Sequence, residues 1–354
     1  MTFYQLLQLD PLPFKKLIQE ANSRQEKRRY IFAFILKNIL VVLFAIVFIG
    51  GANLIFGNEN SSVAVVVFCI LLMVRFVDFG YEIKSSLFSL FLVFFILTVG
   101  PILANSANPY WKLLIHMISI SLLMVLTCLR PSYGNQSIYV FGYLLIQNYP
   151  VTGQLLQMRC LEIGIGFVLC GIIFYCKHHK KHYETHLGNV FKNFSLFDPT
   201  YQWQIKVALG VSLAMFIGDL VHVPRTMWIG FAALAVLQID PKSVKQRLKL
   251  RAPSAIVGSL VFGVICTIFP QILSMLGPIS GLLMGFCATY QWKNAFNCFG
   301  ALLVASSIFG LWNSIFLRIL LNIFGSYFAF GFHLLYDKIM MLFSQTRKNQ
   351  LISQ

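Results

Sequence analysis

Two arginines, Arg159 and Arg318, lie inside long apolar segments, where a charged side chain costs about 2.5–3.5 kcal/mol on insertion scales. Each is followed by six residues and then a glycine, Gly166 or Gly325. A guanidinium presents fixed donors suited to a carboxylate. We therefore predict that Arg159 and Arg318 attract an anion along a pathway through the bilayer. The alternative is that both reach the membrane interface or bind backbone carbonyls in helix packing.

A carboxylate lies beside the first of these arginines. Glu162 follows Arg159 by three residues, so a helix places both on one face. Glu162 is a candidate for proton coupling, or it neutralises the charge of Arg159. The matching position after Arg318 is apolar (Leu321), and the neighbouring Asn322 is a candidate polar partner for Arg318.

Five further side chains are candidates for the same pathway. Asp219 and Arg225 bracket an expected outer loop, which they could gate, or they form a surface pair worth little. Trp228 follows Arg225 at the start of the next apolar segment. His116 and His333 lie within apolar segments, where an imidazole is a proton-relay candidate or a hydrogen-bonded packing residue.

The composition indicates a polytopic membrane protein. The chain has 354 residues, of which 58% are hydrophobic and 11% charged, against about 25% charged in soluble domains. The net charge of +16 comes from basic residues at the ends of apolar segments, which favours a membrane topology over nucleic-acid binding. The eight cysteines form no C-x-x-C pair, so we expect buried thiols without a disulfide framework or metal site.

We predict about twelve transmembrane helices, although the fifth and eighth segments are short and a count of ten or eleven stays open. The expected fold class is therefore an all-α polytopic membrane protein. The expected crossings are 30–56, 61–77, 86–104, 110–128, 136–148, 157–177, 203–221, 226–239, 252–272, 277–290, 294–309 and 312–337.

The basic residues gather in segments that twelve crossings place on one side of the membrane, so both termini should be cytoplasmic. No signal peptide is evident at the N-terminus. The expected parts are an amphipathic N-terminal arm (1–29), a first six-helix repeat (30–177), a basic cytoplasmic linker (178–202), a second six-helix repeat (203–337) and a cytoplasmic tail (338–354).

Short sequence matches that occur in the same order in both halves of the chain indicate an internal duplication. Leu122-Leu123-Met124 matches Leu282-Leu283-Met284, and Phe141-Gly142 matches Phe299-Gly300, at offsets of 158 to 160 residues. Six crossings per repeat give both repeats the same orientation. We therefore predict parallel repeats about an axis along the membrane normal, with the pathway near that axis.

The linker carries four histidines that are spaced among lysines. A metal site is conceivable because two of them stand four apart, but a solvated basic linker is the favoured interpretation. These residues are His178, His179, His182 and His186. A P-loop and the hydrolase and metalloprotease motifs are missing from the sequence, so we expect neither an enzyme nor a cofactor.

The segment from Trp228 onward resembles the signature region of the fusaric-acid-resistance and aromatic-acid-exporter family. Trp228 opens an apolar stretch that ends at Asp240-Pro241, and a basic loop with Arg247 leads into a helix start. The remaining matches are Arg251 and Gly258, and the departures are Ser254 and Ala255. Plant anion channels of the malate type are distant relatives in which two six-helix units surround a pore.

The resemblance implies a transporter of the plasma membrane that exports aromatic or amphipathic organic anions, with coupling to protons. The alternatives are a passive anion channel and a non-transporting scaffold of envelope assembly. The expected partners are a small organic anion and the lipid bilayer, with no nucleic acid. Assembly into a homo-oligomer stays open.

Overall fold

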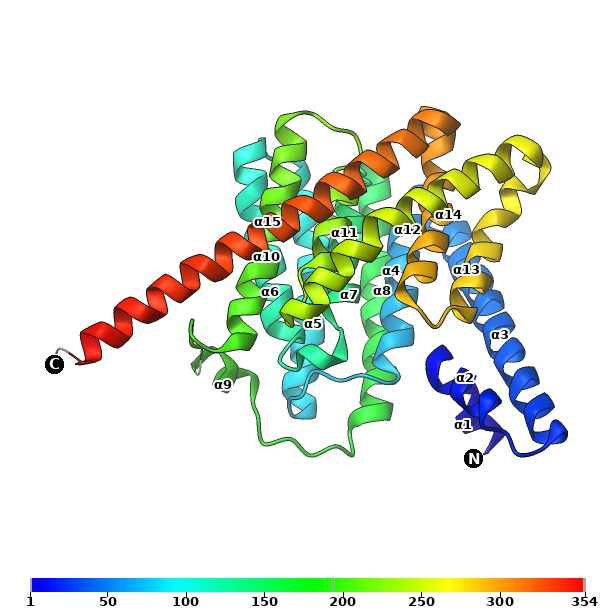
Figure 1. Cartoon of the computed structure of the whole chain (residues 1–354), viewed down its shortest axis with the longest axis horizontal. Coiled ribbons are helices and arrows are strands. Elements are labelled where there is room, and N and C mark those ends of the chain that lie inside the picture. Colours follow the sequence, from blue (N-terminus) through cyan, green and yellow to red (C-terminus); the bar gives the residue numbers. More distant parts are fainter. Residues whose placement is uncertain (1, 193, 353–354) are drawn as a thin grey trace. The chain divides into compact units, whose positions relative to one another are not determined.

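The structure is a computed structural model that describes residues 2–192 and 194–352, and side chains throughout except at 274, 344 and 347–352. Every regular element in these residues is a helix (Figure 1). The chain forms two compact units, each made of separate stretches. Unit 1 comprises residues 1–51 and 249–323, and unit 2 comprises 52–248 and 324–354.

All twelve expected segments coincide with helices, but the number of membrane crossings is not confirmed. Seven helices are long and apolar enough to cross a membrane, and α4, α11 and α13 are shorter apolar helices. The helices are α1 (Phe3–Leu7), α2 (Pro11–Gln19), α3 (Arg24–Phe56), α4 (Ser61–Val74), α5 (Ile83–Asn105), α6 (Pro109–Thr127), α7 (Gln136–Gln147), α8 (Gly153–His178), α9 (Leu187–Lys192), α10 (Pro199–Leu220), α11 (Met227–Val236), α12 (Pro241–Ile268), α13 (Leu276–Phe286), α14 (Tyr290–Phe309) and α15 (Leu311–Ile352), with 3₁₀ turns η1 (Asn58–Asn60), η2 (Pro131–Tyr133) and η3 (Pro270–Met275).

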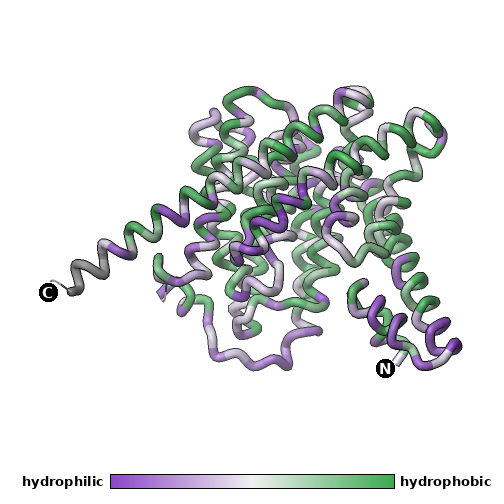
Figure 2. Tube along the Cα trace, in the orientation of Figure 1, coloured by the Kyte–Doolittle hydropathy of each residue, from purple (hydrophilic) through white to green (hydrophobic). Residues whose placement is uncertain are grey.

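Local sequence signals set several helix starts. Asp198 caps α10 by accepting hydrogen bonds from the N–H groups of Thr200 and Tyr201, and Pro199 occupies the first turn. Asn108 caps α6 in the same way, again with a proline next to it. The long helices carry the apolar residues and the connection 178–187 is polar, as Figure 2 shows.

In unit 2, α4, α5, α6, α7 and α8 pack together and α10 lies along α6. Glycines allow the closest approaches. A Cβ at Gly166 of α8 would lie 2.6 Å from Cγ2 of Val67 in α4, and one at Gly325 of α15 would lie 2.6 Å from the carbonyl oxygen of Ile229 in α11. A larger side chain at either glycine would therefore push its helix pair apart.

In unit 1, α12, α13, α14 and the first turns of α15 enclose an apolar core that includes Phe262, Phe299 and Leu302. The N-terminal helices α1 and α2 bury Leu6 and Phe14 against α3. The expected amphipathic arm is thus helical and has an apolar contact face. Its position on the cytoplasmic side stays a prediction.

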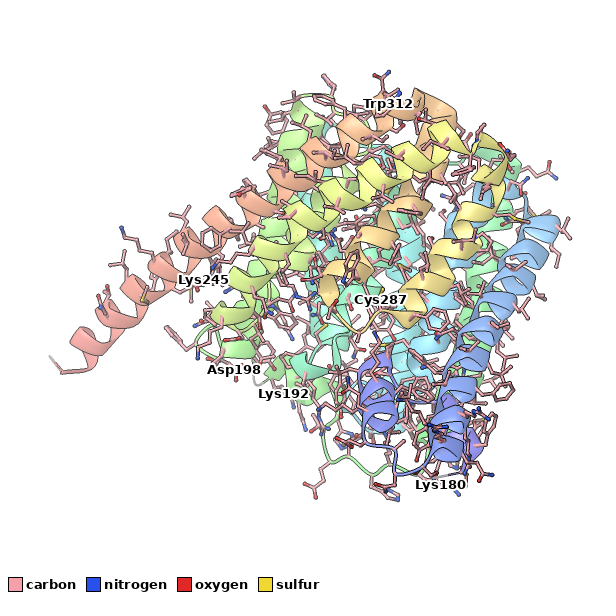
Figure 3. The ribbon with its side chains drawn as sticks, turned by 45° about the vertical axis from the view of Figure 1, so that its right-hand side comes forward. Lys180, Lys192, Asp198, Lys245, Cys287 and Trp312 are labelled. Carbon is pink, nitrogen blue, oxygen red and sulfur yellow. The ribbon has the colours of Figure 1, made fainter. Side chains whose placement is uncertain are left out.

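The connection after α8 is attached to unit 2. Figure 3 shows Lys180 and Lys192 toward the same end of this unit as Asp198, the cap of α10. The expected tail continues α15 as a helix to Ile352, and the last two residues lie outside the described part. These observations leave the two-repeat layout a prediction, because the units follow spatial contacts rather than halves of the sequence.

Candidate functional site

Arg159 is bound to its own chain from three directions. Its Nε donates to Asn60 Oδ1 (2.9 Å), Nη1 to the carbonyl of Tyr149 (2.6 Å) and Nη2 to the carbonyl of Glu59 (3.1 Å). These contacts join the N-terminal part of α8 to η1 and to Tyr149, the second residue after α7. Because all three nitrogens of the guanidinium are used, the geometry favours a structural role for Arg159 over anion binding.

Glu162 lies one turn along α8 and is 5% exposed. Its Oε2 has no hydrogen-bond partner among the described residues. A buried carboxylate in this state is costly unless it binds a proton. Glu162 therefore stays a candidate for proton coupling.

The outer candidates in unit 2 take different partners from those expected. Asp219 Oδ1 accepts from Lys112 Nζ at 2.8 Å, so the ion pair joins α10 to α6 rather than closing the loop with Arg225. Arg225, at φ +64°, places its guanidinium 4.7 Å from the ring centroid of Tyr149. Trp228 is 1% exposed inside α11. An ion pair and a cation–π contact thus contribute to holding this end of unit 2.

The two histidines lie in different surroundings. His116 is fully buried, and its Nδ1 lies 2.7 Å from the hydroxyl of Tyr143 on α7. His333 of α15 is 4% exposed and lies between two charged groups. Its Nδ1 is 3.1 Å from Lys206 Nζ on α10 and 3.2 Å from Asp337 Oδ2 one turn along α15.

Lys206, His333 and Asp337 close into a triangle, because Lys206 Nζ also lies 3.0 Å from Asp337 Oδ1. Lys206 is 6% exposed, whereas the Asp337 side chain is 36% exposed. Neither Lys206 nor Asp337 is among the site residues predicted from the sequence. The spacing of four residues between His333 and Asp337 was the available signal.

Arg318 is 1% exposed in α15, and its guanidinium interacts non-covalently with the thiol of Cys298 on α14. Asn322 donates from Nδ2 to the backbone carbonyl of Arg318 at 2.8 Å, so its amide serves the helix rather than the guanidinium. The charge of Arg251 on α12 also acts on Arg318. Arg318 and Arg251 therefore influence each other electrostatically within unit 1. Arg159 belongs to the other unit, and a shared pathway with Arg318 stays a prediction.

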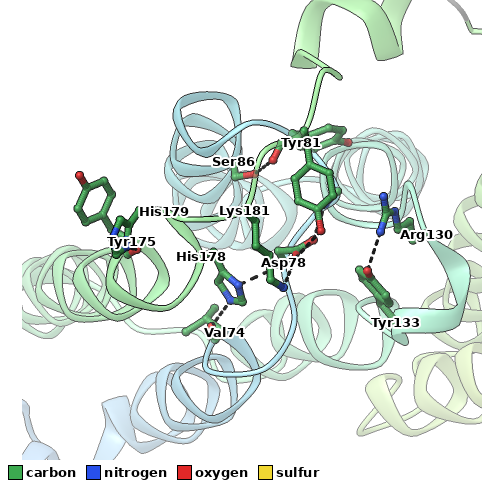
Figure 4. A network of polar contacts seen from close by, with 12 residues as sticks. Val74, Asp78, Tyr81, Ser86, Arg130, Tyr133, Tyr175, His178, His179 and Lys181 are labelled. Carbon is green, nitrogen blue, oxygen red and sulfur yellow. Dashed lines mark hydrogen bonds and ion pairs between the residues drawn. The ribbon is translucent and has the colours of Figure 1, made fainter.

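A further network holds the linker to unit 2 (Figure 4). Asp78 is 2% exposed between Lys181 and His178, and its Oδ2 accepts from Lys181 Nζ (2.7 Å) and the hydroxyl of Tyr183 (3.0 Å). Its Oδ1 accepts from the N–H of Gly80 (2.8 Å). Burial raises the pKa of Asp78, but these hydrogen bonds outweigh it and leave the pKa below its usual value. The linker is therefore an attached strap rather than a freely solvated segment.

The side chains of His, Cys, Asp and Glu form no metal-binding group in the residues that the structure describes. The linker histidines take other partners. His178 Nε2 lies 2.8 Å from the carbonyl oxygen of Val74, and His186 Nδ1 lies 2.8 Å from Glu82 Oε1.

The apolar helices and the buried charged groups between them define a multi-pass α-helical membrane protein. Residues 213–332, from α10 into α15, match the model of the fusaric acid resistance protein-like family, so about a third of the chain is similar to that family. This confirms the predicted resemblance. The family is one of membrane transporters rather than enzymes. No curated protein and no solved structure matches the chain.

Proposed function

We propose that this chain is a proton-coupled transporter that exports aromatic or other amphipathic organic anions across the plasma membrane. The match of residues 213–332 to the fusaric acid resistance protein-like family supports a transporter. The observation that carries the coupling is the triangle of Lys206, His333 and Asp337 between α10 and α15.

A single atom, His333 Nδ1, lies within hydrogen-bond distance of both a cationic donor and a carboxylate acceptor. When Nδ1 is unprotonated, it accepts from Lys206. A proton on Nδ1 reverses this preference, because the N–H then donates to Asp337 and faces the ammonium of Lys206. Binding or release of one proton therefore changes which helix His333 is bonded to.

The triangle also connects a buried group to a more exposed one. His333 and Lys206 are buried, and Asp337 is accessible enough to exchange protons with water. The positive charge of Lys245 also acts on the imidazole of His333 and adds to the positive electrostatic field of Lys206. The reversible contact between α10 and α15 is the element that we expect transport to use.

The test is uptake of a panel of labelled aromatic carboxylates into inverted vesicles, with and without a proton gradient. We expect gradient-driven uptake by the wild type and a loss of about tenfold or more in H333Q and D337N, because the proton site is removed. K338M changes an exposed neighbour on α15 and should transport as the wild type does.

Flux that is equal with and without the gradient would favour the passive channel. If the wild type moves none of the panel, the scaffold alternative replaces the transporter.

A further inference from the structure

Unit 1 contains two buried arginines where α12, α14 and α15 meet. Arg251 on α12 is 6% exposed and Arg318 on α15 is 1% exposed. Cys298 of α14 connects them, since its thiol lies 3.8 Å from the carbonyl of Ala255, one turn after Arg251, and bonds to the side chain of Arg318. The two positive charges thus act on one small region.

The sequence supplies no acid to this part of the chain. From Pro241 to Tyr336 there is neither Asp nor Glu, although the stretch contributes four helices. Two like charges that are buried close together raise each other's cost, and an anion between them would offset it.

Arg251 is positioned but not fully used by its neighbours. Its Nη1 donates to the hydroxyl of Tyr290 (3.1 Å), and its carbonyl accepts from Nδ2 of Asn294 (3.2 Å). Asn294 also donates to Oγ of Ser254 (2.7 Å), which fixes α14 on α12. The buried Nε of Arg251 has no hydrogen-bond partner among the described residues. A donor of a rigid fork is therefore available to a ligand.

Aromatic side chains belong to the same buried cluster as Cys298. Phe299 follows Cys298 directly, and its ring centroid is 5.7 Å from that of Phe262 and 5.8 Å from that of Phe296. Phe262 and Phe299 are buried in the core of unit 1. A ligand with a charged end and an aromatic end would find both surroundings here.

We propose that Arg251 and Arg318 form the binding site for the carboxylate of an aromatic acid, with the ring against Phe262, Phe296 and Phe299. The proposal rests on the transport function above and names its substrate site. Arg251 supplies its free Nε–H and Arg318 supplies the second positive charge. Asn294 and Tyr290 hold Arg251 in place as positioning residues.

The test is equilibrium binding of radiolabelled benzoate to the purified full chain in lipid nanodiscs, with benzamide as a neutral competitor. R251Q and R318Q should each weaken binding by about tenfold or more, which is the loss expected for a charged hydrogen bond. R251K and R318K, which keep the charge but lose the fork, should fall between these variants and the wild type. Benzamide should compete poorly.

K249Q is the matched control, because it removes an equal charge from an exposed position two residues before Arg251. It should bind benzoate as the wild type does. Equal weakening by K249Q would show a general charge effect and overturn the site. Variants should elute as the wild type does, and the lysine variants keep the test open if a glutamine variant fails to fold.

Unchanged affinity in folded R251Q and R318Q overturns this inference, while gradient-driven flux in vesicles would leave the transport function standing. A wild type that binds no benzoate also overturns the inference. If the wild type transports none of the labelled aromatic carboxylates into inverted vesicles, the proposed transport function is rejected instead.

Discussion

At the scale of single residues, the residue type and the apolar sequence around it do not distinguish a charged side chain that binds a ligand from one that is structural. Arg159 and Arg318 look equivalent in the sequence. In the structure, however, Arg159 donates hydrogen bonds to Asn60 and to two backbone carbonyls. The sequence pattern places Arg251 at the end of a basic loop, yet this residue lies within α12, is buried, and acts electrostatically on Arg318. The distinction depends on what each guanidinium touches.

Asp78 gives a residue-scale prediction with a defined pH dependence. D78N should cost about 1–3 kcal/mol of stability, because it removes charge-assisted hydrogen bonds to Lys181 and Tyr183. Because the folded pKa is depressed, the stabilisation is present above about pH 4 and is lost as the pH falls through the folded value. Thermal unfolding from pH 7 down to pH 3 measures the difference.

The same variant should release the linker. Trypsin should cut D78N faster after Lys180 and Lys181, because the strap is no longer held by the carboxylate. D240N is the control. Asp240 is also an aspartate, but it is exposed at the start of α12 and accepts hydrogen bonds from Ser243. If trypsin cuts D78N and the wild type at the same rate, the strap is held by other contacts.

At the scale of elements, glycines set the distances between helices. Two glycines on α8 offer a direct comparison, since Gly166 faces Val67 and Gly164 has no atom within 4 Å of its Cβ position. The difference of two residues turns the side chain to another face of the helix.

G166A should destabilise the chain by about 1–3 kcal/mol through overpacking against α4. G164A should be neutral or stabilising by up to about 1 kcal/mol, because alanine is the better helix former. Thermal unfolding in detergent measures both variants. Adding V67A should restore part of the loss in G166A, and failure of this rescue would mean that the contact does not limit packing.

At the scale of the whole molecule, the helix pairs follow the proposed duplication. The sixth helix of each repeat meets the second through a glycine, as α8 meets α4 and α15 meets α11. The first helix of each repeat packs on the fourth helix of the other. In unit 2, α10 lies along α6, and in unit 1 α3 lies close to α13 at Val42 and Gly281. These helix pairs are consistent with the predicted duplication, and the parallel orientation of the two repeats stays a prediction.

An even number of crossings is the corresponding whole-molecule prediction. S23C and Q345C should react with a membrane-impermeant thiol reagent only from the cytoplasmic side, and S106C only from outside. The background replaces Cys160 and Cys176, which are the exposed native thiols. Labelling of Ser23 and Gln345 positions from opposite sides would mean an odd number, as seven spans would give.

The sequence by itself determined where the helices lie, because apolar length, Pro and Asp caps and polar breaks act over a few residues. The segment from Trp228 to Gly258 also carried the family resemblance, and it lies within the residues that match the family model. The sequence did not predict that Lys181 and Tyr183 bind Asp78.

Only the tertiary structure decided which charged groups meet. Lys206 and Asp337 are 131 residues apart, and Arg251 and Arg318 are on different helices. In a membrane protein the lipid-facing and protein-facing sides of a helix are both apolar, so the helical period does not mark the buried side. Long-range pairing of this kind is a property of the packed helices, and local sequence patterns carry little information about it.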